Sequence, residues 1–179
     1  MLEAWHEFLA YTEEHQPGQW GGYVAYVTAS EATKNYDVLA ILTLMFIGEE
    51  EDAQPALDIL RKLPNTNPLI SQQGESQENN DSWLKWHGVD TTDPVGGNAF
   101  LASRLLQTEN FTTKKSRTEL AEAIIKAGGG LYHLVASKGV QEGDPNGETS
   151  VTPAWRKTVT HFVASTPVSG DPNTLEWMI

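Results

Sequence analysis

Two apolar segments separated by a short turn place the strongest constraint on what this chain can fold into. Residues 23–30 alternate between two faces, and residues 38–47 form a nearly continuous apolar run. Alternation with a period of two is typical of a half-buried β-strand, whereas a continuous run is typical of a strand covered on both faces. The turn around Lys34 and Asn35 makes the pair hairpin-like, so we expect adjacent strands with the second inside the sheet.

Helical spacing of apolar residues predicts three helices. The first covers residues 2–14, and the second begins at the acidic run 49–52 and ends at Pro64. The third begins at Ser116, which we expect to form a capping box with Glu119. In the first helix, the residues expected to lie at the surface are Glu3, His6, Glu7, Glu13, Glu14 and His15.

Further strands are predicted over residues 98–107, 131–138 and 158–164, and the last of them follows a turn at 149–157. Residues 139–150 are expected to form a polar loop. Adjacent strands combined with separate helices indicate an α+β fold, in which an antiparallel β-sheet has helices packed on one face. We expect residues 1–179 to form a single domain.

A long polar segment, residues 65–98, interrupts this regular pattern. Gln, Asn, Ser, Gly and Asp dominate it, apart from an aromatic plug that contains Trp83 and Trp86. Loops of this length are uncommon in compact domains and are often functional, although disorder is the competing interpretation. Most of the tryptophans are expected to anchor packing, but Trp83 and Trp86 are candidates for one wall of an apolar substrate site.

Composition excludes several classes of function. The net charge of −12 argues against a nucleic-acid partner, because phosphate binding needs clustered Lys and Arg. The chain has no cysteine, which excludes disulfides and thiolate chemistry. The longest apolar run has about ten residues, roughly half of a membrane span, and we expect no membrane partner. No compartment is identified, but the absence of a signal peptide favours the cytoplasm.

His133 and His161 are the strongest candidates for catalytic residues, since each interrupts an apolar strand. Both could be hydrogen-bonded core histidines. If their strands are neighbours, however, both line one pocket, where a neutral imidazole can donate or accept a proton. The alternation leaves open which face of the last strand lines the pocket, so Thr160, on the opposite face, is a candidate for substrate binding.

Two arginines and one tryptophan complete the candidate site. Arg104 interrupts an apolar strand, and Arg156 directly follows Trp155. A half-buried arginine often pairs with a carboxylate or a carbonyl for structural reasons, but it can also recognise a carboxylate or enolate oxygen of a substrate. We therefore predict Arg156 as a catalytic residue and Arg104 and Trp155 as substrate-binding residues. No metal site and no phosphate-binding or nucleophile motif is predicted.

Four segments together resemble the substrate-binding domain of fungal FAD-linked oxidases, the berberine-bridge branch of the vanillyl-alcohol-oxidase fold. The segments are residues 46–53, 101–106, 131–140 and 149–161, and the last contains Pro-Ala-Trp-Arg. The sequence has no counterpart of that family's flavin-binding domain, and it ends before the family's C-terminal Tyr-x-Asn-Glu segment. Where the family commonly has Gly-Gly-Ala near the flavin strand, this chain has residues 136–139, which include Lys138.

The resemblance implies a small, largely apolar substrate and leaves three functions open. The first is a cofactor-free cyclase or isomerase of natural-product biosynthesis, which keeps the substrate pocket without flavin and forms a homodimer through the uncovered sheet face. The second is the substrate-binding half of an FAD-dependent oxidoreductase, with FAD supplied by a separate domain or subunit. The third is a non-catalytic binding module. The start at Met1 and the complete pattern of elements favour a whole protein.

Overall fold

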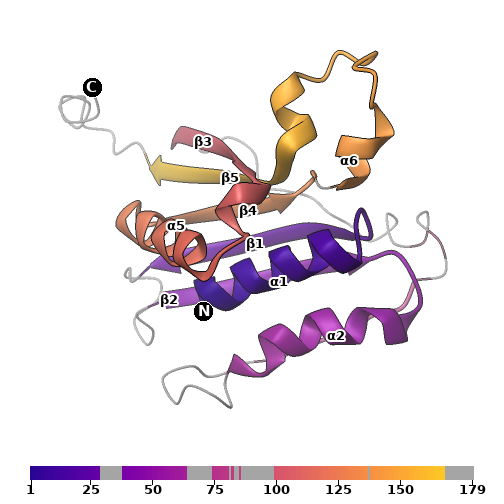
Figure 1. The fold of residues 1–179 in the computed structure, drawn as a ribbon. Helices are drawn as coiled ribbons and strands as arrows, with labels where there is room; N and C mark the ends of the chain where they lie inside the picture. Colours follow the sequence, from indigo (N-terminus) through magenta and orange to yellow (C-terminus); the bar gives the residue numbers. More distant parts are fainter. Residues whose placement is uncertain are drawn as a thin grey trace.

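The computed structural model describes residues 1–28, 38–63, 74–80, 82, 85, 99–136 and 138–167. The elements follow in the order α1 (Leu2–His15), β1 (Trp20–Thr28), β2 (Val38–Phe46), α2 (Glu50–Arg61), β3 (Ala99–Gln107), η2 (Thr108–Asn110), α5 (Lys114–Lys126), β4 (Gly129–Leu134), α6 (Lys138–Gly143), η3 (Pro153–Lys157) and β5 (Thr158–Pro167), where η marks a 3-10 helix. The strands form one antiparallel sheet in the order β2-β1-β4-β5-β3. Helices α1, α2 and α5 cover one face of this sheet (Figure 1). The predicted α+β fold is confirmed.

Strand β2 lies at one end of the sheet, so the prediction that residues 38–47 form an interior strand covered on both faces is wrong. Ile41 is 55% exposed and Leu42 is 40% exposed. Only part of the strand is used by the core, through Ala40 and Leu44. An apolar run reports how much a strand can bury, whereas strand order depends on contacts between distant segments.

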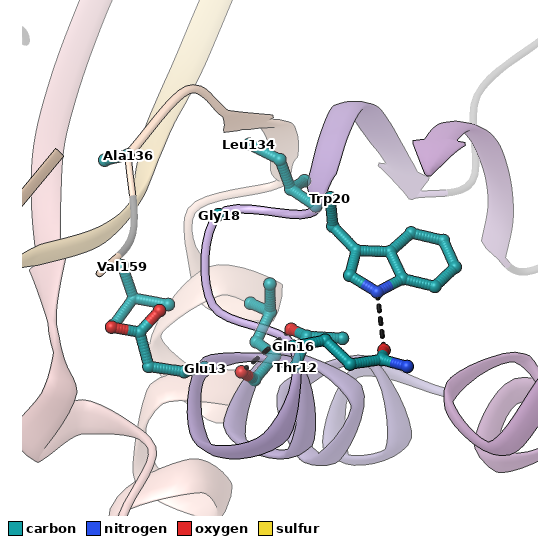
Figure 2. Close-up of a pocket in the computed structure, with 9 residues that line it drawn as sticks. Thr12, Glu13, Gln16, Gly18, Trp20, Leu134, Ala136 and Val159 are labelled. Carbon is teal, nitrogen blue, oxygen red and sulfur yellow. Dashed lines mark hydrogen bonds between the residues drawn. The ribbon is translucent and has the colours of Figure 1, made fainter. Parts of the chain in front are cut away.

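Helix α1 is joined to β1 by a tight connection whose side chains hold the two elements together. Gln16 follows the last turn of the helix, and its side-chain oxygen accepts a hydrogen bond from Trp20 Nε1 at 2.7 Å (Figure 2). The same side chain donates to the carbonyl oxygen of Asp52 in α2. This residue therefore links both helices to the sheet.

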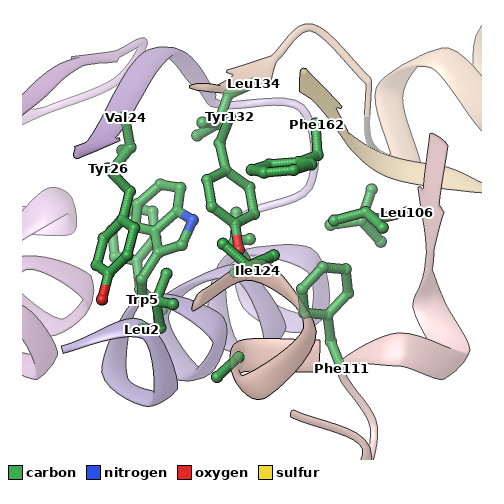
Figure 3. Close-up of a cluster of buried hydrophobic side chains, with 14 of the residues drawn as sticks. Leu2, Trp5, Val24, Tyr26, Leu106, Phe111, Ile124, Tyr132, Leu134 and Phe162 are labelled. Carbon is green, nitrogen blue, oxygen red and sulfur yellow. The ribbon is translucent and has the colours of Figure 1, made fainter. Parts of the chain in front are cut away.

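The core lies between the sheet and the helices and is rich in aromatic rings (Figure 3). Trp5 stacks on Phe8 with ring centroids 4.9 Å apart, and Tyr132 of β4 meets Phe162 of β5 edge-on at 5.0 Å. Gly130 makes room for that contact, because a Cβ at this position would overlap the ring of Phe162. Burial of this cluster is the main favourable term for the fold.

The prediction that His6 lies at the surface is wrong, because its side chain is fully buried. Its Nδ1 donates to the carbonyl oxygen of Arg117 at 3.1 Å, and its Nε2 accepts from the Tyr132 hydroxyl at 2.6 Å. Burial lowers the pKa of His6 from 6.5 to about 4, so the imidazole is neutral near pH 7. The residue connects α1, α5 and β4. Glu13, also predicted at the surface, is only 7% exposed.

Two local predictions are corrected by hydrogen bonding. Helix α5 begins at Lys114, and its capping box joins Thr113 to Ser116, so Ser116 is inside the helix and is not its cap. Part of the predicted loop 139–150 belongs to α6.

In the part of the chain that the structure describes, every helix is too short or too polar to cross a lipid bilayer.

Candidate functional site

The face of the sheet opposite the helices is the candidate site, and we call it the open face. Because side chains alternate along a strand, the positions next to the core residues point to this side. Several of its large side chains are exposed to solvent, including Tyr23 at 50%, Ile41 at 55% and Leu101 at 70%. Its strand positions are Leu39, Ile41, Thr43, Met45, Gly21, Tyr23, Ala25, Leu131, His133, His161, Val163, Leu101, Ser103 and Leu105.

A row of aromatic and imidazole rings crosses the open face. Tyr23 pairs with His133, and His133 pairs with His161, as direct cross-strand neighbours. The ring centroids of Tyr23 and His133 are 5.3 Å apart, and those of His133 and His161 are 5.5 Å apart. Trp155 completes the row, with its ring meeting His161 edge-on at 5.5 Å. The two predicted catalytic histidines are thus side by side.

The surroundings of His133 favour its neutral form. Partial burial lowers the pKa of His133, and the neighbouring His161 lowers it further because two adjacent imidazolium charges would repel each other. A neutral imidazole carries one N–H donor and one unprotonated nitrogen. A neutral His133 can therefore accept a proton from one substrate atom while an N–H of the adjacent His161 ring donates to a nearby atom.

Arg156 directly follows Trp155 in the sequence, but its side chain contacts Asp144 and not the row of rings. Its guanidinium forms an ion pair with the Asp144 carboxylate, and its Nε donates to the Asp144 carbonyl oxygen at 3.2 Å. Hydrogen bonds from Thr149 and from Arg156 hold the pKa of Asp144 well below its ordinary value. Arg156 thereby fastens the segment between α6 and η3, which leads into Trp155. The structure does not bring its guanidinium to the histidine pair.

Two other predicted site residues lie on the opposite side of the sheet. Thr160 is fully buried, and its hydroxyl donates to the carbonyl oxygen of His133 at 2.7 Å. The side chain is therefore placed in the core, beneath the imidazole row. Arg104 pairs with the core residue Phe162 in register and is exposed, with a hydrogen bond to the carbonyl oxygen of Ser103 at 3.3 Å. Neither side chain shares the open face with His161.

The structure adds Tyr23 to the candidate site, whereas two of the predicted tryptophans lie outside the residues that it describes. The alternation of residues 23–30 places Tyr23 on one face, but its register with His133 cannot be read from the sequence. Trp83 and Trp86, the predicted apolar wall, lie outside the described residues. Regular alternation would place Val159 on the same face as His161, but Val159 is buried at an irregularity where β3 and β5 change register.

A solved structure shares this fold. The VAO-type flavoprotein MtVAO713 from Myceliophthora thermophila C1 superimposes with a TM-score of 0.73 at 18% sequence identity. The match covers 99% of this chain and 33% of the flavoprotein, so the chain spans about a third of that protein's length. No protein-family model and no curated protein matches the chain. The comparison supports the vanillyl-alcohol-oxidase-like fold that the sequence resemblance predicts.

The open face fits one part of a flavin better than another. Its exposed apolar and aromatic side chains can cover a planar ring system, as such surfaces commonly do in ligand sites. Its strand positions include no Lys or Arg to bind a diphosphate. The start of α2 is also unsuited to phosphate, because it carries Glu50, Glu51 and Asp52. The residues of the open face could therefore lie against the ring system of a flavin, but neither they nor the start of α2 would hold its diphosphate.

Proposed function

We propose that the open face binds a small, largely apolar substrate and that His133 and His161 transfer protons at it. The observation that carries this proposal is the pair of imidazoles whose ring centroids are 5.5 Å apart on a largely apolar sheet face with several exposed side chains. Tyr23 and Trp155, which contact the two histidines from either side, would hold a planar substrate in place by ring stacking.

Cofactor-free isomerisation or cyclisation is the first reaction that suits this surface. A neutral His133 would take a proton from a carbon next to a carbonyl group, and the N–H of His161 would donate to the carbonyl oxygen as the enol forms. Return of the proton at a different carbon, or attack of the enol carbon on a second group of the substrate, completes the reaction. General acid–base catalysis of this kind contributes about a hundredfold to ten-thousandfold in rate.

Flavin-dependent oxidation is the second candidate, and the likeness to a VAO-type flavoprotein favours it. A flavin, when bound, supplies the acceptor for a hydride. The open face would then form the substrate side of the site, and another domain or subunit would bind the diphosphate. In that arrangement the histidine pair would accept the proton released from the substrate as the hydride departs.

The two candidate reactions also differ in what would cover the open face. Exposed apolar patches of this kind are commonly interaction sites. A second copy of this chain, packed through the same face, would suit the cofactor-free reaction, whereas a flavin-binding partner would suit the oxidation. Light scattering during gel filtration would measure the mass of the purified chain, and a monomer would contradict the homodimer.

Deuterium exchange into 2-tetralone, a planar ketone with acidic C–H bonds, tests the proton-transfer proposal. We expect the wild-type chain to accelerate exchange in heavy water, and His133→Asn and His161→Asn to slow it by at least about tenfold. His15→Asn, on the exposed end of α1, is the matched control and should exchange at the wild-type rate. Equal rates for all three variants and the wild type would contradict the proposal.

Mass spectrometry and absorbance of the purified chain separate the two reactions. Bound flavin in the isolated chain would exclude the cofactor-free reaction. If no flavin is retained, exchange of 2-tetralone by the chain alone supports that reaction. Oxidation of substrate only after a flavoprotein is added supports the second.

A further inference from the structure

A cavity lies on the helix side of the sheet, away from the open face. Its volume is about 320 Å³, and α1, the segment around η2, the start of α6 and β5 surround it. This size is at the lower end of the range for small-molecule sites, roughly 300 to 1,000 Å³. The apolar part of its lining consists of Leu9, Ala10, Phe111 and Val159.

Glu13 is the buried polar group of this cavity. It is 7% exposed, and its carboxylate accepts a hydrogen bond from Gln141 Nε2 at 3.0 Å and another from the backbone of Lys138. Burial raises the pKa of Glu13, since the charged carboxylate has lost solvent. The surrounding charges are those of Lys138, Glu142 and Glu14, so the carboxylates outnumber the ammonium groups.

The carboxylate also borders a smaller cavity of about 20 Å³, which shares Leu9, Glu13 and Val159 with the larger one. Figure 2 shows the Glu13 side chain directed toward Val159 in this smaller space. A volume of this order holds about one water molecule. Glu13 therefore lies at the boundary between a water-sized space and a ligand-sized space.

We propose that the larger cavity binds a small molecule that has an apolar body and a protonated amine placed against Glu13. The four apolar side chains would enclose the body, while the protonated amine would donate a charge-assisted hydrogen bond to the Glu13 carboxylate, which lies largely out of solvent. Thr108 and Thr112, on the far wall, would supply hydroxyl groups for a second polar atom. An anionic ligand is disfavoured, because Glu13 and Glu14 would repel it.

This site is independent of the proposed reaction, because the sheet separates it from the imidazole row. The two are nevertheless joined through β5. Gln141, which holds Glu13, also donates to the carbonyl oxygen of Thr158 at 3.3 Å, three residues before His161. A ligand bound in the cavity could therefore influence β5, the strand that carries His161.

Binding of three matched probes to the full chain tests this proposal. The probes are 2-phenylethylamine, 2-phenylethanol and 3-phenylpropionate, which differ in the charge of one end. Backbone amide NMR shifts would give both the affinity and the location. We expect the amine to bind about tenfold more tightly than the alcohol, and the acid to bind more weakly still. The shifted signals should come from Leu9, Ala10 and Phe111, and Tyr23 should not shift.

Two variants assign the contributions of charge and shape. Glu13→Gln keeps an oxygen for Gln141 and should reduce the affinity for the amine about tenfold without changing that for the alcohol. Glu7→Gln, on the exposed side of the same helix, is the matched control and should change neither. Ala10→Phe fills the cavity and should abolish binding of both, which keeps the proposal testable even if Glu13→Gln does not fold. Equal affinities for all three probes, shifts confined to the open face, or no binding at all would overturn the proposal.

Discussion

Protonation of the buried His6 should make this fold sensitive to mild acid. The pKa of His6 is lowered from 6.5 to about 4 by burial, with a smaller opposing effect from its hydrogen bond to Arg117. Because the folded pKa is depressed, the unfolded chain binds the proton more readily. The contribution of His6 is therefore fully present above about pH 6.5 and is lost as the pH falls toward about 4.

The magnitude follows from the size of the shift. One pKa unit corresponds to about 1.4 kcal/mol, so the whole shift corresponds to about 3.4 kcal/mol. Between about pH 7 and about pH 4.5, about 2.4 kcal/mol of this is lost. The neighbouring charges of Arg117, Glu3 and the N-terminus contribute only smaller effects to this shift. A loss of this size is a large fraction of the stability of an ordinary domain, about 5 to 15 kcal/mol.

Urea unfolding of the wild type and of His6→Gln, monitored by tryptophan fluorescence over this pH range, would measure the loss. The amide of glutamine can replace both hydrogen bonds but does not titrate. We expect the difference in the free energy of unfolding between the two proteins to change by about 2 kcal/mol between the two ends of the range. A difference that stays constant with pH would refute the reasoning, because no titration at His6 would then be linked to folding.

Three further perturbations have defined outcomes. Thr160→Val leaves the carbonyl of His133 without its hydroxyl donor and should cost about 1 to 3 kcal/mol of unfolding free energy, whereas Thr160→Ser, which keeps the hydroxyl, should cost less in the same urea titration. Gly130→Ala places a Cβ within 2.6 Å of a β5 carbonyl oxygen and should cost about 1 to 3 kcal/mol, whereas Gly143→Ala, with nothing within 4 Å, should change the free energy of unfolding by less than about 0.5 kcal/mol. Asp144→Ala should speed hydrogen exchange at the two backbone amides that donate to its carboxylate. In the wild type those amides should stay protected until the pH falls well below 3.8, because the folded pKa of Asp144 is depressed; protection lost at neutral pH would contradict this.

The sequence was sufficient for the fold class because that class depends on local periodicity. Alternating strands and amphipathic helices can be read from apolar spacing alone, and the structure has both. The edge position of β2 could not be read in this way, because it depends on which strands pair. The burial of His6 had a weak signal, since His6 lies four residues from Leu2 and three from Leu9 on the same helical stripe. A polar residue in such a stripe is buried only where the fold supplies hydrogen-bond partners, and the partners of His6, Arg117 and Tyr132, are distant in sequence.

The candidate site shows the same division between local and long-range information. The sequence identified His133 and His161 as polar interruptions of apolar strands, but their pairing depends on the contact between β4 and β5. Thr160 was a competing candidate for substrate binding, because alternation alone does not show that the helices cover its face of the strand. Arg156 was identified by its place beside Trp155, and its partner Asp144, twelve residues earlier, could not be inferred from spacing.

The most direct test of the substrate-binding face is histidine side-chain NMR during titration with 2-tetralone. The imidazole C–H signals of His133 and His161 should move together as the ligand is added, while those of His6 in the core and His15 on the exposed helix should stay fixed. Movement confined to the open-face pair is the result that a ligand on the imidazole row predicts. Unchanged signals from that pair, or equal movement of His15, would contradict it.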